Sequence, residues 1–313
     1  MPDIIVEVCQ NHNGDPKIIR TMLAKAAEAG ATWAKLQCIY SEDLARRDRF
    51  EEGKVQDGKR LVIKRPFGVE FERLRCLDLP LEAYAQAVSW CKEFGLKSMV
   101  TVFSRNRVTE MAKLDWDAVK VASYDCASTP LIKELAESFR YIIISTGATF
   151  AEEVENTASM LDREKFALLH CTTIYPTPAA ATNLKRMDWL KKFSSKVGFS
   201  DHSPVKLLGV NASMVALWRG AEFIERHFTI LDEDKTKDGP VSIKPEHVKQ
   251  LVEFATWDKE KQLSYLRKSV PDYEVYIGTG GLDLTSEELL NRDYYRGRFA
   301  SHVKGQPKYN WED

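Results

Sequence analysis

The segments VGFSDHSP (residues 197–204) and EFIERHFTILDEDKTKDGP (residues 222–240) decide the fold prediction. Each begins as a short apolar run and ends in charged residues, and a helical stretch over 205–219 separates them. This pattern is typical of two parallel strands joined by a helix. It places His202 and His227 at neighbouring strand ends, where two neutral imidazoles are suited to hold a catalytic divalent metal ion. The alternative is that each histidine only packs at its strand end.

The same alternation of apolar runs and helical patterns extends along the chain. Helices are expected between the runs, and the strands are expected at 4–10, 33–39, 97–103, 118–123, 141–146, 166–172, 196–201 and 222–228. Eight strands alternating with helices predict the α/β class, with a (β/α)8 TIM barrel over residues 1–268. A doubly wound open sheet is the alternative, although no GxGxxG follows the first strand.

Two segments fall outside this alternation. Residues 41–78 form a long, charged connection between the second strand and the next helix, and a connection of that length suggests a lid over a site. Residues 269–313 are expected to form a short C-terminal tail, because they are too few for an independent core of normal size.

The overall composition favours a small-molecule partner. The 313 residues carry a net charge of −1, which gives no whole-molecule attraction to nucleic acid or to anionic lipid. The start MPDIIVEVCQ does not resemble a signal peptide, and the sequence has no apolar run of about 18 residues. We therefore expect a soluble cytoplasmic protein that binds neither nucleic acid nor membrane. Its six cysteines lack CxxC pairs and are expected to be reduced.

Two lysines within predicted strands are the most informative polar residues. Catalysis in TIM barrels takes place at the carboxyl ends of the strands, and a buried ammonium is costly unless an anion compensates it. Lys35 and Lys120 are therefore expected to bind a small, highly charged anion together with the hydroxyls of Thr101, Ser123, Ser145 and Ser200. A lysine at a strand edge, a structural ion pair and a Schiff-base lysine are the alternatives.

Two carboxylates lie close to the histidines in sequence. Asp201 precedes His202, and Glu225 is two residues before His227. Either carboxylate could act as an acid or base or orient a metal ligand, and either could equally be structural.

With these residues in place, the chain resembles the sialic acid synthase family, the NeuB-like enzymes. The matching segments are VEVCQNHNGD, AKLQC, TVFSR, VKVASYD, ISTGAT, LLHCTTIYPTP, VGFSDHS and IERHFT, followed by DGP. The resemblance implies a TIM barrel and a carbon–carbon bond-forming transferase. Such an enzyme condenses phosphoenolpyruvate with a sugar aldehyde to give a nonulosonic acid and phosphate. It also implies a divalent metal ion, usually Mn²⁺, with Mg²⁺ and Co²⁺ as alternatives.

The resemblance also implies roles for individual residues. The metal would be held by His202 and His227. Phosphoenolpyruvate would be bound by Lys35, Lys120 and the four hydroxyls named above. The acceptor sugar would face Gln37, Asp125 and Tyr175.

Three departures from the family pattern all concern the acceptor side. Val241 stands where an acidic residue is usual, and Thr173 stands where an asparagine is common. The family's C-terminal antifreeze-like domain, which supplies an arginine to the acceptor, does not follow LTSEELLNRDYYRGRF. We therefore expect an acceptor other than N-acetylmannosamine. Arg296, Arg298 or a separate protein is expected to replace the arginine, and the resemblance implies a homodimer.

Two other functions remain open from the sequence. One is a related synthase that uses a phosphorylated aldose, as in 3-deoxy-octulosonate or heptulosonate synthesis. The other is a non-catalytic paralogue that binds a sugar. The presence of both histidines and both lysines argues against the second function, because a binding remnant needs neither pair.

Overall fold

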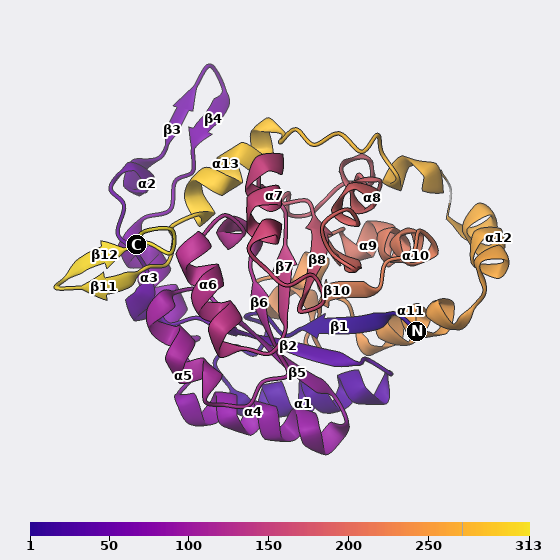
Figure 1. Ribbon diagram of the computed structural model, residues 1–313, viewed down its shortest axis with the longest axis horizontal. Coiled ribbons are helices and arrows are strands. Elements are labelled where there is room, and N and C mark those ends of the chain that lie inside the picture. Colours follow the sequence, from indigo (N-terminus) through magenta and orange to yellow (C-terminus); the bar gives the residue numbers. More distant parts are fainter. Residues whose placement is uncertain (271) are drawn as a thin grey trace.

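Eight short apolar runs form parallel strands that close into a barrel (Figure 1). The computed structural model describes residues 1–270 and 272–313. The first strand pairs with both the second and the last, which closes the barrel and confirms the predicted TIM-barrel class. The barrel strands are β1 (Asp3–Glu7), β2 (Trp33–Cys38), β5 (Lys97–Val102), β6 (Ala118–Val121), β7 (Ile142–Ser145), β8 (Phe166–Cys171), β9 (Lys196–Asp201) and β10 (Phe223–His227).

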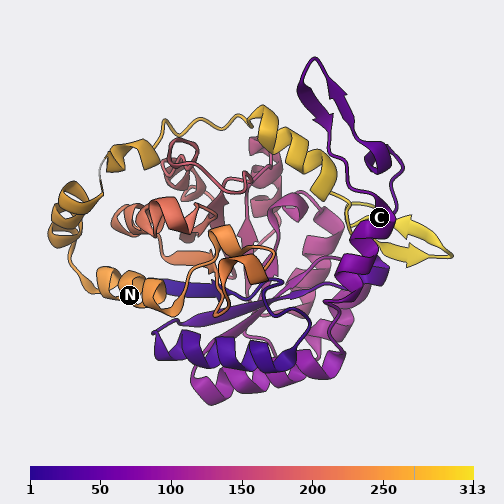
Figure 2. The same cartoon turned by 180° about the vertical axis from the view of Figure 1, so that it is seen from behind.

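Helices surround the barrel and cover the outer faces of the strands (Figures 1 and 2). In the described part of the chain, none of them has the length and apolar character needed to span a bilayer. They are α1 (Pro16–Glu28), α4 (Leu81–Phe94), α5 (Val108–Ala112), α6 (Thr129–Ser138), α7 (Ala151–Ser159), α8 (Arg186–Leu190), α9 (Val205–Leu208), α10 (Asn211–Trp218), α11 (Pro245–Thr256) and α12 (Lys259–Ser269).

The inside of the barrel has an apolar layer below a polar one. The apolar layer comprises Ile5, Trp33, Met99, Ala118, Ile143, Ala167, Leu169 and Phe223. Since alternate residues of a strand face the same side, the residue two positions later also points inward. Those later residues include Glu7, Lys35, Thr101, Lys120, Ser145 and Glu225, and all of them are buried. The two-residue period of the strands therefore places a charged layer directly above the apolar layer.

The connection over residues 41–78 is ordered. One part of it lines the main cavity, and another part projects from the barrel as a hairpin. It contains α2 (Arg49–Glu52), the hairpin of β3 (Lys54–Gln56) and β4 (Lys59–Val62), and α3 (Phe67–Arg75). The hairpin extends away from the barrel in both views (Figures 1 and 2). Arg65 and Arg73 instead line the main cavity, so only that part of the connection has the position expected of a lid.

The C-terminal segment packs against the barrel and does not hang free. It contains α13 (Ser286–Tyr295) and the hairpin of β11 (Ser301–Val303) and β12 (Gln306–Lys308). Phe299 forms a backbone bridge with Leu44, and Asn310 Nδ2 donates to the carbonyl of Phe103 at 2.8 Å. The expected tail is therefore a structural part of the barrel's carboxyl-end face.

A buried carboxylate on α3 fixes this segment in place. Glu70 forms an ion pair with Arg298, and it accepts hydrogen bonds from Arg73 at 2.9 and 3.0 Å. Burial alone would raise the pKa of Glu70, but the hydrogen bonds and charges of Arg73 and Arg298, with the charge of Arg65, lower it to about 2. The carboxylate is therefore ionised at any physiological pH.

We predict that Glu70→Gln lowers the free energy of unfolding by about 3 kcal/mol, because breaking a buried ion pair leaves arginines without an anion. Denaturant unfolding at pH 7 measures the loss. Because the pKa of Glu70 is lower in the folded protein, the loss should shrink as pH falls from 4.5 to about 2. Glu72→Gln is the control, since the Glu72–Arg75 pair is exposed and should contribute less than about 1 kcal/mol. Equal effects of the two substitutions would contradict the prediction.

Candidate active site

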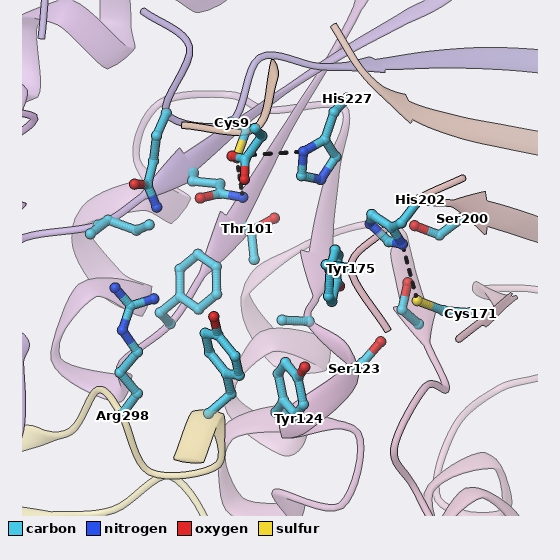
Figure 3. Close-up of a pocket in the computed structure, with 18 of the residues that line it drawn as sticks. Cys9, Thr101, Ser123, Tyr124, Cys171, Tyr175, Ser200, His202, His227 and Arg298 are labelled. Carbon is cyan, nitrogen blue, oxygen red and sulfur yellow. Dashed lines mark hydrogen bonds and ion pairs between the residues drawn. The ribbon is translucent and has the colours of Figure 1, made fainter. Parts of the chain in front are cut away.

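A cavity of about 340 Å³ opens at the carboxyl ends of the barrel strands (Figure 3). Its walls come from the barrel, from the connection over 41–78, from the loop after β10 and from the C-terminal segment. Twelve of the thirteen residues proposed from the sequence line it: Lys35, Gln37, Thr101, Lys120, Ser123, Asp125, Ser145, Tyr175, Ser200, His202, Glu225 and His227.

Lys35 lies on the cavity floor between two carboxylates. Its ammonium forms an ion pair with Glu7, lies 3.7 Å from Glu225 Oε2, and donates to Thr101 Oγ1 at 3.2 Å. Burial lowers the pKa of Lys35 to about 8, although Glu225 partly opposes this shift. The charge of Lys35 is therefore lost as pH rises through the range just above neutrality.

Lys120 has no such carboxylate partner. Its ammonium donates to Ser145 Oγ at 2.6 Å and to the carbonyl of Val121 at 3.0 Å, and no carboxylate of the described residues lies within 4 Å of it. The side chain is only 2% exposed. A buried ammonium satisfied only by neutral groups is an attractive site for an anion.

Glu225 is a second carboxylate near Lys35, and the charges of both lysines act on it. It accepts a hydrogen bond from Ser200 Oγ at 2.8 Å, and its Oε2 has no hydrogen-bond partner. Burial raises the pKa of Glu225, but the charges of Lys120 and Lys35 outweigh burial and lower the pKa. Glu225 is therefore an ionised carboxylate with a free oxygen inside the cavity.

His202 and His227 lie next to each other in the cavity wall, with ring centroids 5.0 Å apart (Figure 3). Burial is the main reason why the pKa of each ring lies below 6.5, so both are neutral imidazoles, the form that binds metals. His227 Nδ1 is buried without a hydrogen-bond partner. The pair therefore fits a divalent metal ion, as the sequence suggested.

Asp201 does not belong to this group, which corrects its proposed catalytic role. Its carboxylate pairs with Arg226 Nη1 at 2.5 Å and accepts from Ser213 Oγ at 2.6 Å, and all three side chains are fully buried. Because side chains alternate along a strand, Ser200 and His202 point into the barrel whereas Asp201 points outward. Its role is structural.

The three residues expected to face a second ligand, Gln37, Asp125 and Tyr175, also line the cavity. Tyr175 packs against His202, with ring centroids 4.4 Å apart. Asp125 Oδ1 accepts hydrogen bonds from Ser128 Oγ and from Asn310 Nδ2, each at 2.9 Å. The C-terminal segment therefore holds one of the residues expected to contact the acceptor.

Sequence reasoning missed Glu7, which lies buried below the cavity, and several residues that line it. Glu7 is two positions after the inward-facing Ile5, so the strand period could have identified it. Cys9 and Asp238 follow strand ends but lie in irregular loops. Arg298 is in the C-terminal segment and lines the cavity, whereas Arg296 contacts Glu153 at 3.5 Å and does not line it. Of the two tail arginines considered, only Arg298 reaches the site.

These features define a TIM-barrel protein whose cavity has two lysines, suited to an anionic ligand, beside a pair of imidazoles. The chain belongs to the NeuB family, whose model matches residues 22–263, and this confirms the resemblance to sialic acid synthases. An N,N'-diacetyllegionaminic acid synthase of Campylobacter jejuni is 28% identical over 85% of this chain and 83% of its own length. A pseudaminic acid synthase of the same organism is 28% identical over 95% and 81%. The crystal structure of the sialic acid synthetase from Leptospira borgpetersenii aligns with a TM-score of 0.70 at 24% identity, over 94% of this chain and 90% of that one.

We predict that binding of inorganic phosphate weakens as pH rises above 8, because Lys35 then loses its charge. The loss should approach roughly tenfold per pH unit once Lys35 is mostly neutral. Isothermal titration calorimetry between pH 7 and 9.5 measures it. Lys35→Met should bind phosphate more weakly and with little change over this range. Equal phosphate affinity of the unaltered protein at both ends of the range would contradict the prediction.

Proposed function

We propose that this protein condenses phosphoenolpyruvate with a sugar aldehyde to form a 3-deoxy-2-keto sugar acid of the nonulosonic type and phosphate. The observation that carries the proposal is the buried ammonium of Lys120. Its hydrogen-bond partners among the described residues are all neutral, and it lies in one cavity with Lys35 and two imidazoles. A donor with a carboxylate and a phosphate matches two separated cationic groups. The names of the relatives support the same reaction class.

In this proposal the lysines and hydroxyls of the cavity floor hold the donor. Lys35 and Lys120 neutralise its two anionic groups, and Thr101, Ser123, Ser145 and Ser200 donate hydrogen bonds to them. Fixing the donor in this way removes much of the entropic cost of bringing two substrates together. The partly closed cavity also limits the water available for simple hydrolysis of phosphoenolpyruvate.

The proposed site for a divalent metal ion is at His202 and His227. When bound, the ion would supply a Lewis acid for the carbonyl oxygen of the acceptor. Mn²⁺ is the metal that the resemblance implies, with Mg²⁺ and Co²⁺ as alternatives.

The reaction balances with one water molecule. The enol double bond of phosphoenolpyruvate supplies the electron pair for a new bond between its C3 and the aldehyde carbon, and the aldehyde oxygen gains a proton. Water then adds at C2, with Glu225 accepting its proton, because Glu225 is ionised and has a free oxygen. The bond between C2 and the phosphate oxygen breaks, phosphate leaves with the electron pair, and the keto group forms. In the overall balance the two protons of the water end on the former aldehyde oxygen and on the departing phosphate.

The acceptor is proposed to differ from N-acetylmannosamine. Val241 lines the cavity and offers an apolar side chain where an acidic residue is usual in the family. A pocket that lacks a hydrogen-bond partner for one polar group of a sugar disfavours that sugar strongly. Arg298 at the cavity wall is the proposed replacement for the family's acceptor-binding arginine.

We predict phosphate release from phosphoenolpyruvate in the presence of Mn²⁺ when the correct acceptor is added. A colorimetric phosphate assay across N-acetylmannosamine, mannose, diacetamido hexoses and phosphorylated aldoses measures it. The combined substitution His202→Ala and His227→Ala should reduce release by at least about a hundredfold, because both proposed metal ligands are lost. His247→Ala is the matched control, since His247 lies at the start of α11 outside the cavity and should keep full activity.

Phosphate release that does not require an acceptor, or that survives loss of both histidines, would contradict the proposed reaction. Release only with phosphorylated aldoses would instead assign the protein to the octulosonate or heptulosonate type of synthase.

A further inference from the structure

A second set of metal-binding groups lies beside His227. Cys9, just after β1, and Asp238, in the loop after β10, each offer a ligand atom, and these atoms and a ring nitrogen of His227 lie within 4.8 Å of one another. Cys9 Sγ is 2.7 Å from Asp238 Oδ2, and this carboxylate oxygen is 3.8 Å from His227 Nδ1. Figure 3 shows Cys9 and His227 side by side in the cavity wall. Ligand atoms of one bound ion lie roughly 3 to 4.5 Å apart, so only a small adjustment separates these groups from a metal site.

The backbone at Cys9 supports a functional reason for this arrangement. Cys9 has a φ of 51°, in the left-handed region that residues with a side chain rarely adopt. Such a conformation costs about 1 kcal/mol and tends to occur at functional sites. The backbone N–H of Cys9 donates to Glu7 Oε1 at 2.6 Å, so the turn is fixed to the end of β1. The thiol is therefore held at the cavity by a strained turn.

Lys35 and Arg226 lie close enough for their charges to act on His227, but they do not reach the carboxylate of Asp238. Among the described residues, no lysine or arginine forms an ion pair with Asp238. His227 Nδ1 is buried and has no hydrogen-bond partner. The thiol of Cys9 donates to Asp238 Oδ2, and Cys9 Sγ in turn accepts a hydrogen bond from Gln37 Nε2 at 3.4 Å. A cation at this point would replace the thiol proton beside the carboxylate and would give the imidazole nitrogen a partner.

We propose that Cys9 and Asp238 join His227 as ligands of the divalent metal ion, so that the chain supplies one sulfur, one oxygen and one nitrogen atom. His202, whose ring centroid is 5.0 Å from that of His227, provides a further nitrogen. When the ion binds, the thiol of Cys9 releases its proton to solvent and the sulfur forms the bond to the metal. This inference deepens the proposed metal-dependent reaction by assigning two ligands to it.

A sulfur ligand changes which metal the site prefers. Thiolate favours Zn²⁺ and other softer ions, whereas Mn²⁺ and Mg²⁺ favour oxygen ligands. Removing the sulfur therefore weakens Zn²⁺ binding by about tenfold or more and changes Mn²⁺ binding much less. Of the ions named above, Co²⁺ therefore suits the proposed ligand set better than Mn²⁺ or Mg²⁺.

The test is the absorption spectrum of the full chain after removal of metals with a chelator and addition of Co²⁺, without any substrate. Cobalt bound to a thiolate gives an intense near-ultraviolet charge-transfer band, and cobalt bound only to nitrogen and oxygen does not. We expect the band in the unaltered protein, its loss in Cys9→Ser and a weaker, shifted band in Asp238→Asn. Cys9→Ser keeps a group that can hydrogen-bond to Asp238 but lacks the sulfur.

Cys171→Ser is the matched control, because Cys171 is the other cysteine that lines the cavity and its Sγ is 3.7 Å from His202 Nδ1. The band should persist in this variant. Failure of Co²⁺ to bind, absence of the band in the unaltered protein, persistence of the band in Cys9→Ser, or its loss in Cys171→Ser would each overturn the inference. The first two of these outcomes are measured on the unaltered protein, so they do not depend on whether a variant folds. Because no substrate is present, the result is independent of whether phosphate release identifies an acceptor.

Discussion

The compensation of a buried ammonium is the constraint on which the rest of the site depends. The strand register of the barrel places Glu7 of β1 opposite both Lys35 of β2 and His227 of β10. Barrel closure therefore brings the carboxylate of Glu7, the ammonium of Lys35 and the imidazole of His227 together in one layer. Burying the charge of Glu7 or of Lys35 alone would cost several kcal/mol. The Glu7–Lys35 ion pair therefore favours this strand register over a slipped one. Among the described residues no carboxylate forms an ion pair with Lys120, and this supports the proposal that the cavity binds an anion.

The sequence was sufficient to predict the barrel and most of its floor because both follow from the two-residue period of strands. Four residues of the floor each come two positions after a residue of the apolar layer inside the barrel: Lys35, Lys120, Ser145 and Glu225. The same rule, applied strictly, would have added Glu7 and excluded Asp201, which faces the helices and pairs with Arg226. Those two errors come from judging polar residues by their nearness to a strand end without asking which way they point.

The rest of the cavity could not be predicted because it depends on contacts between distant segments. Arg298 reaches the site only because Glu70, 228 positions earlier, holds it there. Asn310 similarly reaches across the barrel face to Asp125. Cys9 owes its position to a turn with a positive φ, which no propensity predicts for cysteine. These residues surround the proposed acceptor and metal sites, so the local sequence describes those parts of the cavity least.

The central claim is that one cavity joins the carbon skeletons of two substrates. Mass spectrometry of the products formed from phosphoenolpyruvate labelled with ¹³C at all of its carbons tests this claim most directly, with the metal-loaded protein and each acceptor in turn. The account predicts a new keto acid that carries every labelled carbon together with the carbon skeleton of the acceptor. Recovery of the label only as phosphoenolpyruvate or pyruvate with every acceptor would contradict it.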